Sequence, residues 1–263
     1  MRGNEVFSQK VIYDKQYEKA EDTFKVTFWE ISAVKMIIDG VKPSKKSVIL
    51  DVGCGLGRIL TLISLLASCY CIGIDLSFKG IKVAKNYAKK IKAGKFCDFI
   101  VADVRFLPFK PLCFDTVLCH HVLEHIPDDR RTLEKVVDKL KNEGKIFIAT
   151  PNTHKRVLPF IQFYYRRSDK LYGHLRRYKV ETLTKYLKEL NLKVLDCGYY
   201  DGLLKNIVLS LPGMSGYKTH NLRNLSIIGK LNMIFWFIAE KIEKKFRYLP
   251  VAANLYVIAE KTL

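Results

Sequence analysis

The sequence predicts an α/β fold built on a mostly parallel sheet. From residue 47 to residue 150, short apolar runs alternate with segments of helical periodicity, a pattern typical of parallel strands joined by right-handed crossovers. The first apolar run, from Val48 to Val52, leads into Gly53, Gly55 and Gly57. Glycine lets the backbone turn sharply and lets another molecule approach closely. This stretch therefore predicts a strand, a tight loop and then a helix.

The remaining elements follow in order along the chain. Apolar residues from Phe24 to Ile38 predict helices that precede the core and partly cap it, ended by Asp39-Gly40 and Pro43. Residues 151–180 are expected to be irregular and basic, with Asp169 as their lone carboxylate. Further helices are expected at Arg58–Leu66, around Ile81–Lys85 and at Val180–Leu190. Further strands are expected at Cys69–Asp75, Glu143–Asn152, Leu192–Tyr199 and Ala253–Glu260, and two more are expected to begin at Phe99 and at Phe114.

These elements suggest a single domain in four parts. They are an N-terminal helical cap (1–44), a core (45–202), an insertion (203–250) and a last strand (251–263). The insertion centres on an apolar run that includes Phe235 and Trp236 and is followed by lysines. It is too short and too interrupted for a transmembrane helix. Packing on the sheet, a lid over a substrate and contact with a membrane surface are the open alternatives for it.

Composition limits the classes of partner and compartment. The chain has 263 residues, 49% of them hydrophobic, which suffices for one full core. Its net charge of +19 favours an anionic partner such as nucleic acid, acidic lipid or a phosphorylated substrate; a lysine-rich surface without such a partner is the alternative. Seven scattered cysteines without C-x-x-C pairs and the lack of a signal-like start predict a cytoplasmic protein with reduced thiols, with peripheral membrane association as an alternative.

The acidic-G-x-G-x-G pattern from Asp51 to Gly57 resembles the first motif of class I methyltransferases that use S-adenosylmethionine (SAM). A dinucleotide fingerprint would place its third glycine one residue later. The segments that end at Asp75, contain Asp103, contain His120 and end at Asn152 resemble the family's second to fifth strands in the same order. The resemblance covers about residues 45–200 and the last strand. It implies a Rossmann-like, seven-stranded, mostly parallel sheet with helices on both faces and helical cap and insert elements.

The resemblance also implies a SAM site. Asp51 and the glycine loop would hold the methionine end, and Asp75 would accept hydrogen bonds from the ribose. Asp103 and Val104 would flank the adenine, and His120 would lie against the cofactor. The full set of candidate cofactor-binding residues is Asp51, Gly53, Cys54, Gly55, Gly57, Arg58, Asp75, Leu76, Asp103, Val104 and His120.

Histidines are the candidate catalytic residues, because a hydroxyl acceptor must lose its proton. We propose His121, His125 and His174 for this role. The Leu123-Glu124-His125 segment and the segment from Gly173 to Tyr178 resemble the ubiquinone/menaquinone-biosynthesis-like branch, the methyltransferase type 11 group. If a helix begins there, His121, Glu124 and His125 share one face and offer a set of divalent-metal ligands. We expect no metal, because His121 replaces a glutamate of that branch's pattern.

These features predict a SAM-dependent methyltransferase that methylates oxygen on a small or lipid-like acceptor. An RNA methyltransferase is the first alternative, favoured by the basic charge but unsupported by any recognisable RNA-binding module. A non-catalytic SAM-binding protein is the second, disfavoured by the intact glycine loop and the three acids Asp51, Asp75 and Asp103. Contact with an anionic membrane is expected if the acceptor is lipid-like.

Overall fold

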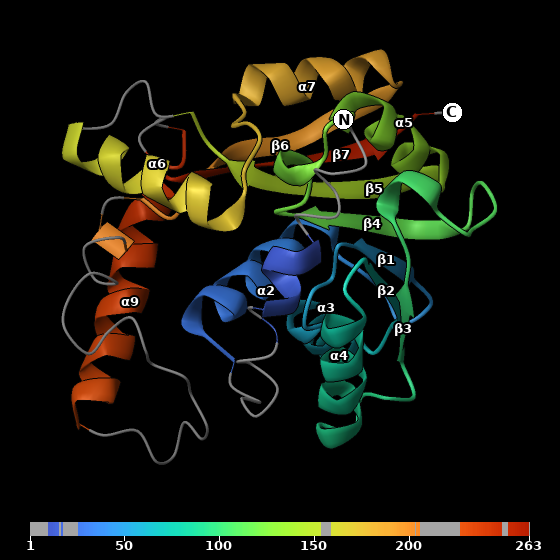
Figure 1. Ribbon diagram of the computed structural model, residues 1–263, viewed down its shortest axis with the longest axis horizontal. Helices are drawn as coiled ribbons and strands as arrows, with labels where there is room; N and C mark the ends of the chain where they lie inside the picture. The colour runs from blue at the N-terminus through green and yellow to red at the C-terminus, as the bar shows by residue number, and fades with distance from the viewer. Residues whose placement is uncertain are drawn as a thin grey trace.

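The computed structural model describes residues 10–15, 17, 26–153, 159–202, 204–205, 227–248 and 252–262. Its centre is a seven-stranded sheet in the order β3-β2-β1-β4-β5-β7-β6 (Figure 1). The strands are β1 (Val48–Val52), β2 (Tyr70–Asp75), β3 (Cys97–Val101), β4 (Phe114–His120), β5 (Leu140–Pro151), β6 (Leu192–Tyr200) and β7 (Asn254–Lys261). The α-helices are α2 (Phe28–Val41), α3 (Arg58–Ala67), α4 (Phe78–Lys90), α5 (Asp129–Asp138), α6 (Pro159–Tyr172), α7 (Val180–Glu189) and α9 (Ile227–Lys245).

The predicted mostly parallel sheet is confirmed. Strand β1 pairs in parallel with β2 and β4, β2 with β3, and β4 with β5, whereas β7 runs antiparallel to both β5 and β6. The carboxyl ends of the parallel strands therefore meet at one edge, which is where ligands bind in open α/β sheets. Asp51 lies opposite Gly73 in the register of β1 and β2, so the glycine loop and the end of β2 lie side by side.

Helices cover both faces of the sheet, as predicted. In Figure 1, α5 and α7 lie above the sheet, and α2, α3 and α4 lie below it. Alternation along each strand divides the apolar side chains between these layers: Leu50 packs with Leu133 and Leu183 of the upper helices, and Ile49 packs with Ile63 of α3 and other residues of the lower layer. This two-faced core fixes the edge at which the loops converge.

Local signals explain most helix boundaries. Thr27 and Glu30 form a reciprocal capping box at the start of α2, and the Ser77 hydroxyl caps α4 by accepting the N–H of Gly80. Helix α2 continues to Val41, beyond the end predicted at Ile38. Gly40 lies inside this helix. A side chain at this position would collide with Ile258 of β7, so glycine allows the helix to pack closely on the sheet.

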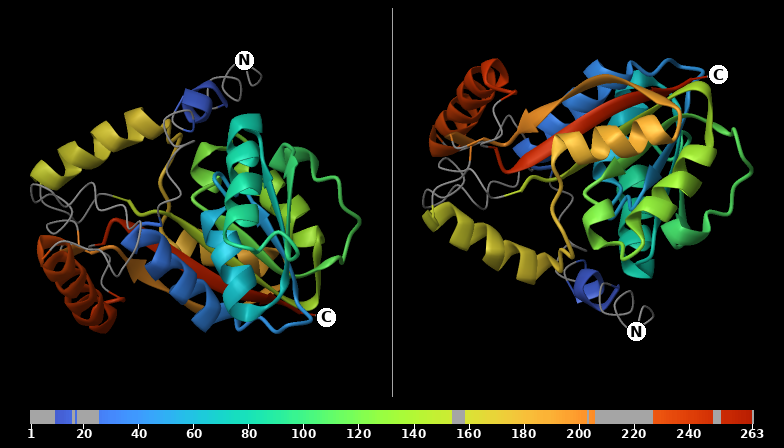
Figure 2. Two further views of the ribbon diagram at one scale, coloured as in Figure 1. Left: turned by 90° about the horizontal axis from the view of Figure 1, so that it is seen from below. Right: turned by 90° about the horizontal axis from the view of Figure 1, so that it is seen from above.

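The expectation that residues 151–180 are irregular is wrong for their middle part, which forms α6. Proline suits the first position of a helix and glycine its end, and α6 begins at Pro159 and stops before Gly173, whose φ is +69°. Figures 1 and 2 place α6 and α9 together at one end of the molecule (left in each view). The basic composition of this segment gave no helical signal, but Pro159 and Gly173 mark the two ends of the helix.

The insertion contributes α9, whereas Leu203, residues 206–226 and residues 249–250 lie outside the described residues. Sequence analysis left packing, a lid and membrane contact open for the apolar run that includes Phe235 and Trp236. The structure separates them: Trp236 is 2% exposed and Phe235 57% exposed. The Trp236 indole packs near Phe28 and donates from Nε1 to the Ser32 hydroxyl at 3.1 Å. Trp236 therefore anchors α9 on α2, so the packing alternative applies to this residue.

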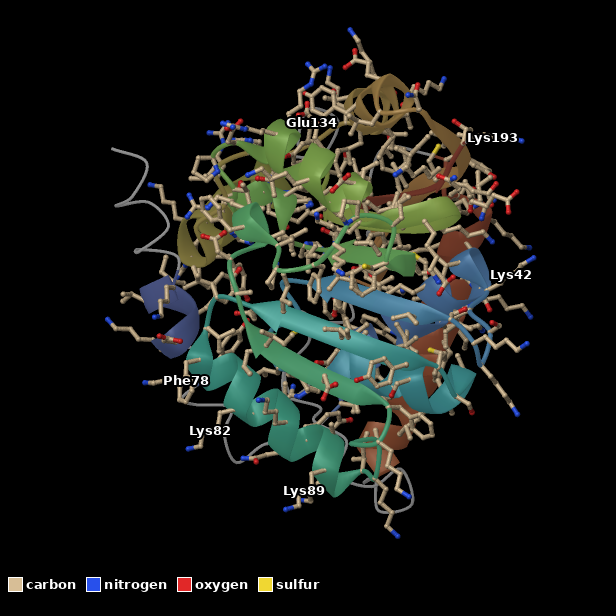
Figure 3. The ribbon with its side chains drawn as sticks, turned by 90° about the vertical axis from the view of Figure 1, so that its right-hand side faces the viewer. Lys42, Phe78, Lys82, Lys89, Glu134 and Lys193 are labelled. Carbon is tan, nitrogen blue, oxygen red and sulfur yellow. The ribbon has the colours of Figure 1, made fainter. Side chains whose placement is uncertain are left out.

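The outer surface of α9 is apolar. Its exposed large side chains include a row spaced by four residues, which places them on one face of the helix: Ile234, Ile238, Ile242 and the following Phe246. None of the helices in the described part of the chain is both long and apolar enough to cross a bilayer. Lysines lie on several sides of the protein; in Figure 3 the side chains of Lys82 and Lys89 point outward from α4 and that of Lys193 from β6.

Replacing Trp236 with alanine should lower the free energy of unfolding by about 3–5 kcal/mol, because it removes a large buried side chain and leaves a cavity. Phe235→Ala, in the same helix but on its exposed surface, should change it by less than about 1 kcal/mol. Urea denaturation followed by circular dichroism measures both. Equal destabilisation by the two variants would contradict the anchoring role of Trp236.

Candidate functional site

A cavity of about 670 Å³ lies at the carboxyl edge of the sheet. It joins the glycine loop after β1 to the histidines after β4. Most of the predicted site residues line it: Asp51, Gly53, Cys54, Arg58, Asp75, Leu76, Asp103, Val104, His120, His121, His125 and His174. The structure thus brings the predicted cofactor and catalytic residues into one continuous space.

The two remaining loop glycines, Gly55 and Gly57, are not among the residues that line the cavity. Gly53, Gly55 and Gly57 all have positive φ, at +73°, +53° and +66°, a conformation that glycine adopts without strain. A Cβ on Gly57 would lie 2.6 Å from Ala84 and 2.6 Å from Phe99. Gly57 therefore permits close packing of the loop on its neighbours rather than lining the cavity.

The Asp75 carboxylate organises the loop. Its Oδ2 accepts the N–H of Gly55 and its Oδ1 accepts the N–H of Ser77, each at 2.8 Å. Burial raises the pKa of Asp75, and these hydrogen bonds oppose the rise. Because each carboxylate oxygen can accept more than one hydrogen bond, Asp75 can still bind the hydroxyl groups of a ribose.

Asp51, at the end of β1, is only 5% exposed. Burial, with a further contribution from the charge of Asp75, raises the pKa of Asp51 to about 8. Its carboxyl group is therefore mostly neutral at pH 7 in the ligand-free protein. A cationic ligand in the cavity would favour the ionised form.

Asp103 reaches the cavity but already has a strong partner. Both of its oxygens accept hydrogen bonds from the Arg105 guanidinium, at 2.6–3.0 Å, and Oδ1 also accepts the Arg105 N–H at 2.9 Å. This arrangement caps the short 3₁₀ turn η1 (Val104–Phe106). The resemblance implies that Asp103 lies beside the adenine of the cofactor. In this structure the Asp103 carboxylate is already paired with the Arg105 guanidinium.

His120 has a polar atom available for a ligand. Its Nε2 is buried and has no hydrogen-bond partner among the described residues, which is uncommon in folded proteins. The ring lies 5.0 Å from the Trp29 ring. Burial, together with the neighbouring His121, holds the pKa of His120 well below its ordinary value. A neutral, unpaired imidazole at the floor of the cavity fits a binding role.

The next segment differs from the predicted helix. After β4, η2 (Leu123–His125) is a single 3₁₀ turn, and α5 begins only at Asp129. His121 has a positive φ of +57°, and its Nδ1 donates to the buried Glu124 at 3.0 Å while its Nε2 accepts from the Tyr200 hydroxyl at 2.8 Å. Both nitrogens of His121 are thus engaged, so His121 does not present a free base.

His174 is oriented differently. Its Nδ1 lies 2.7 Å from Asp169 Oδ1, and because a carboxylate accepts, Nδ1 carries the hydrogen. Asp169 is held in turn by the Arg177 guanidinium, whose Nε lies 3.0 and 2.9 Å from its two oxygens. In the neutral ring Nε2 of His174 then carries no hydrogen and can accept a proton. A histidine that is oriented by a carboxylate at the wall of a cavity is the usual arrangement of a general base.

Glu124, His125 and His174 place one potential metal-ligand atom each within 4.8 Å of one another. Burial would raise the pKa of Glu124, but the hydrogen bond and charge of His121 lower it. However, His125 has its Nε2 2.9 Å from the Tyr13 hydroxyl and its Nδ1 3.4 Å from the Gly173 carbonyl. With both nitrogens occupied, His125 does not fit a metal ion in this arrangement. The set also differs from the sequence-based alternative, which contained His121.

Sequence reasoning missed several residues of the cavity. Tyr13, Tyr17, Trp29, Asp201 and Asn254 all line it. Trp29 donates to Asp201 Oδ2 at 2.8 Å, and the Asn254 amide donates to the same oxygen at 2.9 Å. They come from segments far apart in the chain, so no local motif links them. The one available signal was the spacing of Tyr13 and Tyr17, one helical turn apart.

Known proteins resemble this chain at the level of the core. Residues 50–148 match a family model described as a methyltransferase domain. A ubiquinone biosynthesis O-methyltransferase of Nitrosomonas europaea is 34% identical over 127 residues, covering 48% of this chain and 52% of the relative. The enzyme of the same name from Paracidovorax citrulli is 33% identical over 119 residues, covering 45% of this chain and 50% of the relative. The chain thus matches about half the length of these curated relatives.

A solved structure extends the similarity to the whole fold. A methyltransferase of Haloferax volcanii, in complex with the Trm112 methyltransferase activator, superposes with a TM-score of 0.64 and 15% sequence identity, covering 97% of each chain. At this identity the likeness establishes the fold alone. The glycine loop, the strand-end acids and the local sequence match agree with one another. Residues 50–148 therefore match a methyltransferase domain and are similar to part of the ubiquinone biosynthesis O-methyltransferases.

Proposed function

We propose that this chain transfers the methyl group of SAM to a hydroxyl oxygen of a small or lipid-like acceptor. The observation that carries the proposal is the single cavity that connects the glycine loop and Asp75 to the Asp169-oriented His174. A cofactor site and a proton-accepting site must adjoin in any such enzyme. The O-methyltransferase names of the two relatives agree with oxygen as the acceptor atom.

Features of this chain support SAM as the ligand. The positive-φ loop brings backbone close to the cavity without side chains in the way, Asp75 retains acceptor capacity, and the buried His120 Nε2 has no hydrogen-bond partner among the described residues. Asp51 and Gly53 would hold the methionine end and Asp75 the ribose. The sulfonium supplies the activated methyl group, so these residues need only bind, align and exclude water.

Proton removal is assigned to His174. Its Nε2 would take the proton of the acceptor hydroxyl as the oxygen–carbon bond forms and the sulfur–carbon bond breaks. Asp169 would keep the ring in the required tautomer and stabilise the imidazolium that results, and Arg177 would fix Asp169. His121, with both nitrogens engaged, would contribute to the shape of the pocket.

The first test is cofactor binding. We expect SAM and its demethylated product to bind with micromolar dissociation constants, and Asp75→Ala to weaken SAM binding by about 1–3 kcal/mol through loss of charged hydrogen bonds and loosening of the loop. Titration calorimetry measures this. Asp98→Ala, which removes a carboxylate from the edge strand β3, is the control and should bind as the parent does. A folded parent protein that binds neither ligand would refute the proposal.

His174→Gln should lower the rate of methyl transfer by about a hundredfold or more, since general-base catalysis contributes on that scale, without weakening SAM binding. Asp169→Asn should have a smaller effect in the same direction. Mass spectrometry of lipid extracts incubated with protein and deuterium-labelled SAM gives the rate, and Lys193→Ala serves as a remote control. An unchanged rate in His174→Gln would exclude it as the base.

The same assay tests for a metal. Because both nitrogens of His125 are engaged by Tyr13 and Gly173, we expect a chelator such as EDTA to leave the rate of methyl transfer unchanged. Loss of activity on chelation, restored by added Mg²⁺ or Mn²⁺, would require Tyr13 to release His125 and would reassign Glu124, His125 and His174 as metal ligands.

A lipid-like acceptor is supported by α9. The exposed Lys241, Lys244 and Lys245 lie beside the C-terminal half of its exposed apolar row, a combination suited to the interface of an anionic membrane. Helix α9 also reaches the cavity wall indirectly, since Glu240 and Trp236 contact Ser32 of α2, one turn from Trp29. Peripheral membrane contact would therefore bring the acceptor source close to the site.

Vesicles containing anionic lipid should bind the protein more strongly than neutral vesicles, and added salt should weaken binding, since screening acts within about 10 Å at 0.1 M. The double variant Phe235→Ser, Ile238→Ser should bind vesicles less but keep its fold and SAM affinity. Leu112→Ser, an exposed leucine in the loop before β4, is the matched control. If structured RNA displaced the vesicles as efficiently as anionic lipid does, the acceptor would be sought in RNA instead.

A further inference from the structure

A buried lysine connects the insertion to the wall of the cavity. Lys205 is only 4% exposed, and lysine is rarely buried to this extent unless its charge is paired. Its Nζ lies 3.5 Å from Asp201 Oδ1, 3.9 Å from Glu240 Oε2 and 4.9 Å from the centre of the Trp236 ring. The ammonium is therefore shared between a carboxylate that directly follows β6 and two side chains of α9.

The Asp201 carboxylate holds two residues of the cavity wall in place. Its Oδ2 accepts hydrogen bonds from Trp29 Nε1 at 2.8 Å and from the Asn254 amide nitrogen at 2.9 Å. The amino group of the Asn254 amide therefore faces Asp201, because the amide oxygen could not donate to it. The Trp29 ring lies 5.0 Å from the His120 ring and 5.7 Å from the His121 ring, measured between centres. One carboxylate thus fixes both an aromatic ring and the orientation of an amide.

These contacts lie away from the cofactor end of the cavity. Asn254 begins β7 and pairs with Pro151 of β5 and Tyr200 of β6, and β4 and β5 separate β7 from the strand that leads into the glycine loop. Among the described residues, the Asn254 side chain makes one hydrogen bond, through its nitrogen. Its Oδ1 can therefore accept a hydrogen bond from a molecule in the cavity.

The backbone of this segment is anchored without the lysine side chain. The Glu243 carboxylate of α9 accepts the N–H of Gly202 at 2.9 Å and the N–H of Lys205 at 3.0 Å. The Ser32 hydroxyl of α2 donates to Glu240 at 2.7 Å, so α9 is also held by α2. A change in the Lys205 side chain therefore removes one charge while these attachments remain, and the ammonium can be tested apart from the fold.

We propose that Lys205 is a positioning residue for the methyl acceptor. The inference rests on the proposed function, in that the molecule beside Asn254 is the acceptor. The ammonium offsets the buried charge of Asp201, because neutral donors alone leave such a charge poorly compensated. Asp201 in turn keeps Trp29 beside the histidines and leaves the Asn254 amide oxygen to accept from a hydroxyl or N–H group of the acceptor. Loss of the ammonium would loosen the acceptor end of the cavity and leave the SAM end unchanged.

The first measurement needs no ligand. The chain has two tryptophans, so nitrogen-15 spectra contain two indole N–H signals, and Trp29→Phe identifies the signal of Trp29. We expect this hydrogen to exchange slowly with solvent in the parent. Lys205→Met keeps the length of the side chain and removes its charge. It should speed the exchange about tenfold, which is the effect of losing one hydrogen bond to a charged group.

Three further variants test whether the charge is responsible. Lys205→Arg retains the charge and should keep most of the slow exchange, and Lys193→Met, at an exposed lysine of β6, should exchange as the parent does. Asp201→Asn needs no counter-ion and covers the case in which Lys205→Met does not fold; it should also speed exchange, because a neutral acceptor binds the indole less strongly. Exchange at the parental rate in folded Lys205→Met or Asp201→Asn would overturn the inference.

The second measurement follows methyl transfer from deuterium-labelled SAM by the full chain, with the lipid extract diluted in steps. Lys205→Met should raise the extract concentration that gives half the maximal rate about three- to tenfold, while SAM affinity in titration calorimetry stays parental. Asn254→Ala should do the same. The double variant should be no worse than either single variant, because both changes remove the same contact.

Additive losses in the double variant, or weakened SAM binding in folded Lys205→Met, would contradict a positioning role at the acceptor end. A parent that shows the slowly exchanging Trp29 hydrogen and its sensitivity to Lys205→Met, but binds neither SAM nor its demethylated product, would instead refute the proposed function.

Discussion

The hydrogen bonds that Asp75 accepts from Gly55 and Ser77 fix the geometry of the whole site. One carboxylate at the end of β2 holds both the loop that follows β1 and the start of α4. The loop can approach the carboxylate because its glycines adopt positive φ, and α4 begins where it does because Ser77 is oriented for capping. The N-terminal helical segment depends on the same arrangement, since Tyr17 lies against Gly55 and Gly80 and the Asp14 carboxylate accepts the Ser77 hydroxyl. The neighbouring strand ends then supply the other walls of the cavity.

Much of this could be predicted from the sequence because the relevant signals are local. The apolar runs, the alternate glycines and the acids at strand ends lie within a few residues of the structure that they specify. The seven-stranded, mostly parallel sheet and the helices on both faces agree with that reasoning, and Asp51, Asp75 and His120 line the cavity. Gly57 is also required by packing against Ala84 and Phe99, which no local pattern reveals.

What could not be predicted depends on contacts between distant segments. Trp236 and Phe235 are adjacent and equally apolar, yet only the position of α2 decides that the first is buried and the second exposed. His121 and His174 are equally plausible bases in the sequence. Their difference arises because Tyr200 and Glu124 occupy both nitrogens of one, whereas Asp169 occupies a single nitrogen of the other. Asp169 stood out as the lone acid in a basic stretch, but its partner could be identified only in three dimensions.

The buried Asp51 has a consequence for the order of events at the site. With its pKa raised to about 8, this carboxyl group is largely protonated at neutral pH until a cation lies beside it. In the proposed complex, the positively charged SAM would expel that proton, whereas the demethylated product, which has lost the sulfonium charge, would expel less. Binding of the two forms would then differ in proton release, so acidification would weaken the retention of SAM more than that of its product. The site would then distinguish SAM from its product by the protonation state of Asp51 rather than by a direct contact with the methyl group.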